Sequence, residues 1–338
     1  MKAAILKKPK VIKIEDIPKP KPKTNEVLIK IKEVGLCGSD VHYYNNGRIG
    51  NFVLRKPIIL GHESAGIVEE VGEDVKNLKA GDRVTIEPGV PCKRCNYCRE
   101  GNYNLCSDIR FMATPPDDGA FIEYLTYDSD FVYKIPDNTS LTSGALIEPL
   151  SVGYSACTRA NIAPGDIILI LGSGPIGLAT LEVAKIFGPS RIYIADINDY
   201  RLNVAKKNGA YETINILKQD IFKILKKIQI DLVIEASGVQ ESIINSVKIV
   251  KRGGKVIWIG MGNDSIPIPY PIVISKDLTV EGIFRYKNTY SPIIKLLKDS
   301  KINIEYLVSH HFKFKDILKA FKLSSRPNFN KLKIVIDI

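Results

Sequence analysis

Short apolar runs separated by glycine and proline fill the first 150 or so residues of the chain. Runs rich in β-branched residues cover Glu26–Val34, Ser64–Val71, Asp82–Glu87 and Ala120–Tyr127. β-branched side chains favour strands, and glycine and proline favour the turns between them. This part of the chain is therefore predicted to form a compact β-rich domain.

From about residue 165 the pattern changes to short apolar strands that alternate with helical stretches. Helices are predicted near Gly177–Phe187 and Gln240–Val250, and a Gly-Pro or Gly-Gly pair follows each of them. The predicted strands are Ile167–Leu171, Arg191–Asp196, Glu212–Asn215, Asp231–Ser237, Lys255–Gly260 and Leu278–Phe284. Alternating strands and helices with strongly apolar strands indicate a parallel, doubly wound sheet. Six strands is the number of a complete dinucleotide-binding fold.

The residues after Tyr290 provide too few elements for another domain. They predict a helix, a strand near Leu307–Phe312, a second helix near Phe314–Leu323 and a final strand at Lys331–Ile338. We expect them to return to the β-rich domain. The predicted fold is α/β, with a β-rich domain over residues 1–153 and 290–338 and a doubly wound domain over 154–289.

The charge and hydropathy of the chain restrict its partners. Lys and Arg (48) exceed Asp and Glu (37), but the basic residues occur singly or in pairs with acidic residues between them. A nucleic-acid-binding protein concentrates this charge on one face or tail, so no nucleic-acid partner is expected. No apolar run reaches the roughly 18 residues of a membrane span. The N-terminal segment returns to lysine before a signal-peptide core could form, so a cytoplasmic location is expected.

A glycine-rich turn follows the first strand of the doubly wound part. Gly172, Gly174 and Gly177 form G-x-G-x-x-G between a predicted strand and a helix, with Pro175 and Ile176 inside the motif. Asp196 closes the next strand 19 residues after Gly177, where a carboxylate would take the ribose 2′-hydroxyl of NAD. A carboxylate there would repel the extra phosphate of NADP, although the nearby Arg201 could accept one. The alternative is that the glycines serve only helix–strand packing.

Four of the six cysteines lie within one short loop. Their spacing, C-x2-C-x2-C-x7-C, supplies the four thiolates of a closed structural zinc site. An iron–sulfur cluster is chemically possible, but nothing else in the sequence suggests electron transfer. The four residues are Cys92, Cys95, Cys98 and Cys106.

A second set of possible metal ligands is dispersed along the chain. Cys37 begins a Cys-Gly-Ser-Asp-x-His segment, His62 precedes Glu63, and Glu148 precedes a proline. A catalytic zinc needs about three protein ligands of mixed type and one exchangeable position. Cys37, His62 and a glutamate would provide them, but the sequence does not decide between Glu63 and Glu148. Cys157 is expected in the core, and no role is assigned to His310 or His311.

Taken together, these motifs resemble the zinc-containing medium-chain alcohol dehydrogenases. The resemblance rests on GHESAGIVEEVG (Gly61–Gly72), GDRV (Gly81–Val84), the four-cysteine loop and GSGPIGL (Gly172–Leu178), and it runs the whole length of the chain. It implies a GroES-like catalytic domain and a Rossmann coenzyme domain within the bounds given above. It also implies NAD, two zinc ions per subunit and a homotetramer.

Finer features are similar to the polyol (sorbitol dehydrogenase) branch of that family. They are CGSDVHYY (Cys37–Tyr44), ATPPDDG (Ala113–Gly119), EPLSVG (Glu148–Gly153) and GIFRYKNTY (Gly282–Tyr290). By this resemblance Cys37, His62 and Glu63 bind the catalytic zinc, and Glu148 holds its water or replaces it. Ser39 and His42 are candidates for the proton path. Implied substrate contacts are Tyr43, Glu148, Arg285 and Tyr286, and implied cofactor contacts are Ile176, Asp196, Arg201, Ile259, Gly260, Met261, Phe284 and Arg285.

The expected activity is oxidation of a secondary hydroxyl of a polyol to a ketose, with hydride transfer to NAD. A zinc dehydrogenase acting on L-threonine or 2,3-butanediol is the alternative within the same chemistry. A zinc-bearing binding or structural protein without turnover is the alternative of another class. The complete set of Cys37, His62 and Glu63 argues against that last hypothesis.

Overall fold

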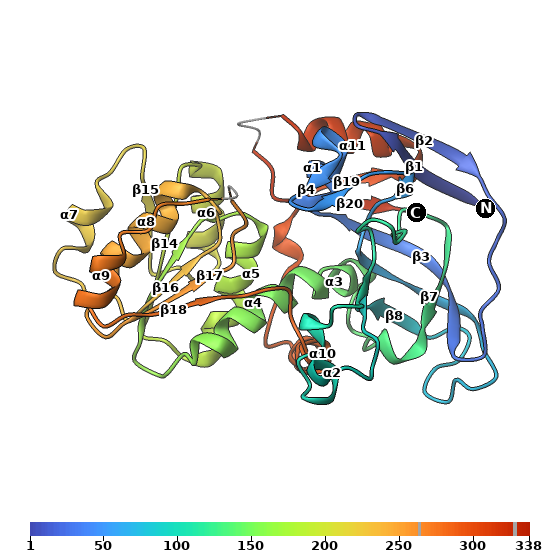
Figure 1. Cartoon of the computed structure of the whole chain (residues 1–338), viewed down its shortest axis with the longest axis horizontal. Helices are drawn as coiled ribbons and strands as arrows, with labels where there is room; N and C mark the ends of the chain where they lie inside the picture. Colours follow the sequence, from blue (N-terminus) through green and yellow to red (C-terminus); the bar gives the residue numbers. More distant parts are fainter. Residues whose placement is uncertain (263–264, 327–329) are drawn as a thin grey trace. The chain divides into compact units, whose positions relative to one another are not determined.

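The chain forms two compact units in the computed structural model, which describes residues 1–262, 265–326 and 330–338. The first unit contains Met1–Glu148 together with Tyr290–Ile338, and the second contains Pro149–Thr289 (Figure 1). The C-terminal residues thus join the β-rich part of the chain.

The first unit is built on a seven-stranded sheet with the strand order β12-β8-β7-β3-β20-β19, and β11 also pairs with β3. The long central strand β3 alternates buried and more exposed side chains along part of its length, as a strand with one face toward the core does. The strands are β3 (Glu26–Leu36), β7 (Glu63–Val71), β8 (Arg83–Ile86), β11 (Tyr124–Asp128), β12 (Val132–Lys134), β19 (Val308–Lys313) and β20 (Lys333–Asp337).

Shorter elements surround this sheet and help to enclose the core of the first unit. Leu6, Ile29, Ile31, Phe121 and Phe321 are among its fully buried side chains. The helices are α1 (Gly38–Asn46), α2 (Asn96–Arg99), α3 (Leu141–Ala145), α10 (Tyr290–Lys298) and α11 (Ile317–Ser324). The remaining strands are β1 (Lys2–Lys8), β2 (Val11–Asp16), β4 (Arg48–Ile49), β5 (Phe52–Val53), β6 (Ile58–Ile59), β9 (Gly89–Val90) and β10 (Arg110–Phe111).

The second unit contains a six-stranded parallel sheet with the order β15-β14-β13-β16-β17-β18. Successive residues of β13 are buried on both faces, as expected when helices cover both sides of a sheet. The strands are β13 (Ile167–Leu171), β14 (Arg191–Asp196), β15 (Glu212–Asn215), β16 (Leu232–Glu235), β17 (Lys255–Trp258) and β18 (Thr279–Gly282). This order confirms the predicted doubly wound fold, whose switch point lies between β13 and β16.

The helices of this part are α4 (Ile147–Ala160), α5 (Pro175–Ala184), α6 (Asp199–Lys207), α7 (Ile221–Leu225), α8 (Gln240–Ile249) and α9 (Tyr270–Ser275). Several details differ from the sequence prediction. The strand expected from Ala120 begins at Tyr124, because the backbone of Ala120 and Phe121 bonds to Gly61 and Leu60 instead. Helix α4 and the β1–β2 hairpin were not predicted.

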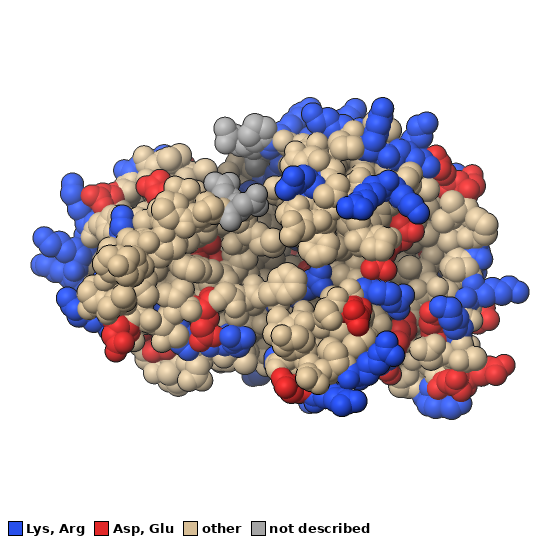
Figure 2. Space-filling view, in the orientation of Figure 1, with Lys and Arg blue, Asp and Glu red and all other residues tan. Residues whose placement is uncertain are grey.

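The surface carries basic and acidic side chains together. Figure 2 shows Lys and Arg spread over both units on the visible face, with Asp and Glu among them. In the part of the chain that the structure describes, none of the helices is long and apolar enough to cross a membrane.

Candidate active site

Three neighbouring strands of the first unit bring distant residues to one end of the sheet. Strand β3 ends directly before Cys37, β7 begins at Glu63, and β20 begins at Lys333. Gly35 of β3 lies opposite Glu63, and Leu36 lies opposite Ile334. Because β3 runs antiparallel to both neighbours, its end meets their beginnings.

Cys37, His62 and Glu63 form a compact cluster at this end of the sheet. One ligand atom from each residue lies within 4.8 Å of the others, close to the separation of ligands that share one ion at about 2.0–2.3 Å. His62 and Glu63 are buried, and Cys37 is half-buried at the N-terminus of α1. A helix N-terminus stabilises negative charge, which suits a thiolate ligand.

Asp40 holds the backbone of this cluster together. Its fully buried carboxylate accepts hydrogen bonds from the amides of Cys37 and Gly61, each at 3.0 Å, and lies 3.7 Å from His62 Nδ1. Burial disfavours a charged imidazole, but Cys37 and Asp40 outweigh it and raise the pKa of His62 well above its ordinary range. The site therefore favours positive charge at His62, whether from a proton or from a bound cation.

Gly61 has a conformation and surroundings that exclude a side chain. Its φ is +90°, and a Cβ atom there would lie 3.0 Å from side-chain atoms of both Phe121 and Val34. Only glycine combines this left-handed backbone with such close packing. The turn into His62 and Glu63 therefore depends on it.

Lys333 forms a buried ion pair with Glu63. Its Nζ donates to Glu63 Oε1 at 2.6 Å, and the two side chains are 3% and 0% exposed. Burial opposes the charge of the ammonium group, but Glu63, Cys37 and Glu148 outweigh it and raise the pKa of Lys333. Lys333 thus compensates the negative charge that gathers at this site.

The second carboxylate oxygen of Glu63 is left for another partner. Among the described residues, no donor reaches the buried Oε2. Gly35 opens the space around it, since a Cβ at Gly35 would lie 2.1 Å from this oxygen. An orphaned carboxylate oxygen beside a thiol and an imidazole matches the sulfur, nitrogen and oxygen ligands of a zinc ion.

The other residues predicted for this site lie on two helices. Glu148 is buried in the first turn of α4 and lies near Lys333, outside the three-residue cluster. Ser39 is half-buried and His42 is exposed, both on α1. Tyr43 is also on α1, with 2% exposure within the core of this unit.

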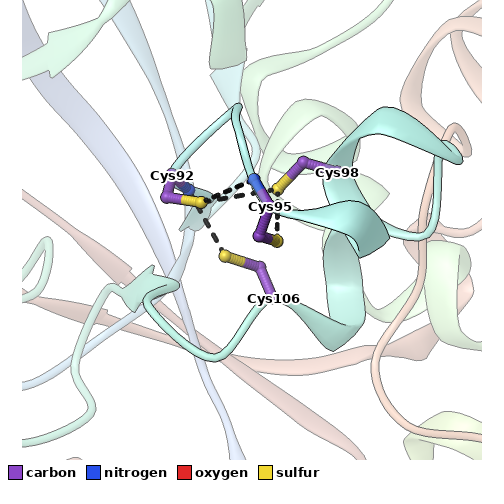
Figure 3. Close-up of side chains that lie close together, drawn as sticks. All are labelled: Cys92, Cys95, Cys98 and Cys106. Atoms are coloured by element: carbon purple, nitrogen blue, oxygen red, sulfur yellow. Dashed lines mark hydrogen bonds between the residues drawn. The ribbon is translucent and has the colours of Figure 1, made fainter.

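The four cysteines of the loop also come together. Figure 3 shows Cys92, Cys95, Cys98 and Cys106 with their sulfur atoms facing one another. The four sulfur atoms lie within 4.8 Å of one another. Cys95 Sγ lies 3.4 Å from Cys98 Sγ, far beyond the ~2.05 Å of a disulfide bond. Backbone amides of Cys92 and Cys95 point at Cys106 Sγ and Cys92 Sγ, each at 3.4 Å. This is the donor set of a closed tetrahedral zinc site.

The thiols of the loop differ strongly in acidity. Backbone hydrogen bonds from Arg94 and Cys95 lower the pKa of Cys92 to about 6. Burial and the neighbouring thiols raise the pKa of Cys98 to about 12, and burial also raises that of Cys106. Four thiolates this close repel one another unless a cation lies between them.

A third cluster of possible ligands lies at the edge of the same sheet. Glu33, His311 and Asp337 also have ligand atoms within 4.8 Å. His311 is exposed and Lys313 already pairs with Asp337 at 3.0 Å. We therefore assign it no metal.

In the second unit, the glycine motif forms the turn from β13 to α5. Gly172 has a φ of +99°, and Gly174 precedes Pro175 at the start of the helix. A Cβ at Gly177 would lie 1.9 Å from the carbonyl oxygen of Gly172. The third glycine thus lets the helix approach the turn, and the amides at the helix N-terminus suit a pyrophosphate.

Asp196 closes β14 beside this turn. Its Oδ2 accepts from the Ser173 amide at 2.6 Å, and its Oδ1 accepts from the Asn198 amide at 2.9 Å. Arg201 follows in the first turns of α6, with a guanidinium nitrogen 3.8 Å from where a Cβ at Gly174 would lie. The carboxylate and the glycine turn therefore form one structure at the carboxyl ends of β13 and β14.

The remaining predicted residues of the second unit follow β17 and β18. Ile259 and Gly260 donate backbone hydrogen bonds to Glu235 O, and Met261 is 78% exposed. Phe284 is exposed with the guanidinium of Arg285 4.9 Å from its ring centroid, and Tyr286 is buried. All of these positions lie beyond the carboxyl ends of the strands, where α/β sheets bind their ligands.

Three polar residues of the first unit escaped the sequence analysis: Asp40, Lys333 and Glu87. Asp40 lies inside the CGSD segment, but nothing in the sequence indicates that its carboxylate bonds to the amides of Cys37 and Gly61. Lys333 lies among other lysines, and its partner Glu63 is 270 positions away. Glu87 belongs to none of the motifs.

Comparisons with known proteins agree with this geometry. The model of the alcohol dehydrogenase GroES-like domain matches residues 23–137, and that of the zinc-binding dehydrogenases matches residues 175–299. The chain is 43% identical to sorbitol dehydrogenase of Bacillus subtilis (strain 168) over 341 residues, which cover 99% of this chain and 97% of the relative. It is 40% identical to L-idonate 5-dehydrogenase of Vitis vinifera over 339 residues, with 97% and 92% covered.

Solved structures agree as well. An alcohol dehydrogenase of Escherichia coli CFT073 complexed with NADH superposes with a TM-score of 0.94 at 27% identity, covering 100% of this chain and 99% of that one. The matches confirm the expected combination of a GroES-like domain with a Rossmann domain. The chain therefore belongs to the zinc-dependent medium-chain dehydrogenases, close to the sorbitol dehydrogenases, and is an oxidoreductase.

Proposed function

We propose that this enzyme oxidises a secondary hydroxyl of a polyol to a ketose and transfers hydride to NAD. The observation that carries the proposal is the cluster of Cys37, His62 and Glu63, whose mixed ligand set matches that of a catalytic zinc. Its relatives include a sorbitol dehydrogenase and an L-idonate 5-dehydrogenase, both of which act on polyhydroxylated compounds by name.

We assign Cys37, His62 and Glu63 to a catalytic zinc and the four cysteines of the loop to a structural zinc. The orphaned Oε2 supports Glu63 as a direct ligand, and Glu148 would act from beside the ion. The bound metal would supply Lewis acidity at the substrate hydroxyl, and the nicotinamide ring would accept the hydride.

The residues around the metal site have positioning and proton-handling roles in this proposal. Asp40 fixes the turn that carries His62, and Lys333 holds one oxygen of Glu63 so that the other remains available. The proton released from the substrate hydroxyl would leave through Ser39 and the exposed His42, or through Glu148. Tyr43, Glu148, Arg285 and Tyr286 are the proposed substrate contacts.

NAD is the proposed cofactor because Asp196 closes β14 beside the glycine turn, where a carboxylate favours the ribose hydroxyls over a 2′-phosphate. The NADH complex of the related Escherichia coli enzyme supports the same assignment. The family resemblance further supports a cytoplasmic homotetramer, which light scattering coupled to size-exclusion chromatography would test.

The test is a comparison of kcat/KM for sorbitol, xylitol, L-threonine, 2,3-butanediol and ethanol with NAD under one set of conditions. A site built to hydrogen-bond several hydroxyls rejects analogues that lack them, so the polyols should be preferred and ethanol should be poor. If threonine or butanediol exceeds the polyols by about tenfold (about 1.4 kcal/mol in transition-state binding), the polyol assignment fails.

A pair of cysteine variants separates the metal site from general effects of cysteine loss. Cys37→Ala should abolish turnover, because it removes a ligand from the cluster. Cys157→Ala should keep most of the activity, because Cys157 is buried in the second unit and bonds only weakly to the carbonyl of Thr180. Retained activity in Cys37→Ala would contradict the proposed zinc site.

A further inference from the structure

Glu87 is a buried carboxylate outside both proposed metal sites. It follows β8 directly and is 1% exposed. Tyr103 Oη donates to its Oε1 at 2.7 Å, and Tyr133 Oη donates to its Oε2 at 2.9 Å. A buried carboxylate needs such partners, because its desolvation costs several kcal/mol when they are missing.

The two tyrosines belong to different parts of the first unit. Tyr103 begins a 3-10 turn in the cysteine loop, between Cys98 and Cys106. Tyr133 lies in β12, which pairs with β8, and its ring stacks on Tyr290 at 5.2 Å between centroids. The Tyr103–Glu87 hydrogen bond therefore joins the cysteine loop to the sheet.

A second link between the loop and the same region is exposed. Lys93 pairs with Asp128 at 3.0 Å and with Asp130 at 2.5 Å, and its side chain is 44% exposed. Exposed ion pairs contribute little to stability. The buried hydrogen bond from Tyr103 should therefore carry more of the attachment. Neither link involves a cysteine sulfur.

We propose that Glu87, through Tyr103, anchors the cysteine loop to the sheet independently of the metal in the loop. When the four thiols are not bound to zinc, this anchor keeps the loop docked. Burial raises the pKa of Glu87 to about 7, and the hydrogen bonds from the two phenols oppose this rise. The ionised form of Glu87 therefore depends strongly on both phenol donors.

The anchor has a consequence for the proposed active site. The base of the loop is closed by β9 and β10, which pair through Gly89 and Phe111. The ring of Phe111 lies 5.9 Å from that of His62. Docking of the loop therefore keeps Phe111 against a proposed zinc ligand, even when the loop has lost its own metal.

The test measures the rate of tryptic cleavage after Arg99, which is an exposed residue of the loop. The full chain is compared before and after its zinc is removed by a thiol-compatible chelator. Zinc content is measured in each sample. In the parent protein, chelation of the loop zinc should raise the cleavage rate by less than about threefold. In Tyr103→Phe the same treatment should raise it by about tenfold or more, because a hydrogen bond to a charged group is lost.

Two controls separate the anchor from other contacts. Lys93→Met removes the exposed link and should behave like the parent. Tyr133→Phe removes the other phenol hydrogen bond to Glu87 but leaves the bond from Tyr103 in place. Cleavage after Arg99 should therefore rise less in this variant than in Tyr103→Phe. Glu87→Leu serves as an independent variant if Tyr103→Phe folds poorly, and it should release the loop to the same extent.

The proposal would be overturned if chelation alone exposed Arg99 about tenfold in the parent protein, since the metal would then be the only anchor. It would also fail if Tyr103→Phe and Lys93→Met were cleaved at equal rates after chelation. None of these outcomes depends on the substrate or on turnover. The inference rests on the proposed function only for the zinc of the loop, and the measured zinc content tests that ion separately.

Discussion

At the scale of single residues, the Lys333–Glu63 pair is the most consequential contact of the candidate site. Two opposite charges are buried together, with Glu63 also facing the proposed metal. The net contribution of such a pair to stability is small, but removing one partner leaves an uncompensated charge and typically costs about 3–5 kcal/mol.

We therefore predict that Lys333→Met lowers the free energy of unfolding by a few kcal/mol, about 3 or more, measured by urea denaturation. Lys313→Met, which removes an exposed lysine of the neighbouring strand, should change it by less than about 1 kcal/mol. The double variant Lys333→Met with Glu63→Gln should recover much of the loss, because neither member of the pair is then left as an uncompensated charge. Equal stability of the Lys333→Met variant and the parent would contradict the buried pair.

Asp196 gives the second prediction at this scale. Asp196→Asn keeps the size of the side chain but removes its charge, so the ratio of kcat/KM with NAD to that with NADP should fall about tenfold. The control is Asp199→Asn, which changes an acid of α6 that bonds to Asn215 and Lys218 instead. An unchanged ratio in Asp196→Asn would show that another residue selects the cofactor.

The candidate site residues that the sequence could indicate are those that carry a local signal. Gly172, Gly177 and Asp196 follow a known spacing, and the cysteine loop is contiguous. Lys333 could not be predicted, because a lysine in a lysine-rich chain gives no sign that a strand pairing will bury it. Its role depends on a tertiary contact with a residue far away in the chain.

At the scale of elements, Glu87 at the end of β8 makes the stability of the protein depend on pH. Glu87 has a pKa of about 7 in the folded protein, above its ordinary value of 4.5. The phenols of Tyr103 and Tyr133 donate to it, and Tyr127 interacts with it electrostatically. An acid with a raised pKa supports folding fully below its unfolded pKa, and this contribution is lost as the pH rises through about 7. The free energy of unfolding of Glu87→Gln, taken relative to that of the parent, should therefore rise by about 2 kcal/mol from pH 5.5 to pH 8.5.

Urea unfolding of both proteins at the two pH values measures this difference directly. The thiol of Cys92, with a pKa of about 6, also titrates in this range, but it is present in both proteins and its effect cancels in the comparison. A difference that does not change with pH would mean that Glu87 is ionised equally in the folded and unfolded states.

The strands of the parallel sheet were predicted better than helix α4. The parallel strands were visible because both of their faces are buried, which gives continuous apolar runs such as Ile167–Leu171. Helix α4 was missed because Pro149 and Gly153 lie within it, and these residues usually oppose helices. Proline is tolerated in a first helical turn, and Gly153 permits close approach, since a Cβ there would lie 2.9 Å from the Thr180 amide.

At the scale of the whole molecule, the two ligand clusters predict the metal content. The parent should contain two zinc ions per chain, and Cys106→Ser should contain one and unfold at a lower temperature, because a structural site would be lost. Cys157→Ala should retain both ions. Elemental analysis of the purified proteins measures the counts, and two zinc ions in Cys106→Ser would refute the assignment of the loop.

The discontinuous first unit also has a consequence for how the protein is made. Strand β20, which brings Lys333 to Glu63, is translated only after the whole second unit has been translated. Until then the nascent sheet lacks β19 and β20, and the Glu33–Leu36 part of β3 presents an open edge that can pair with other chains. The second unit is continuous and can fold during synthesis, whereas Glu63 of the proposed metal site lacks its partner Lys333 until β20 has been translated.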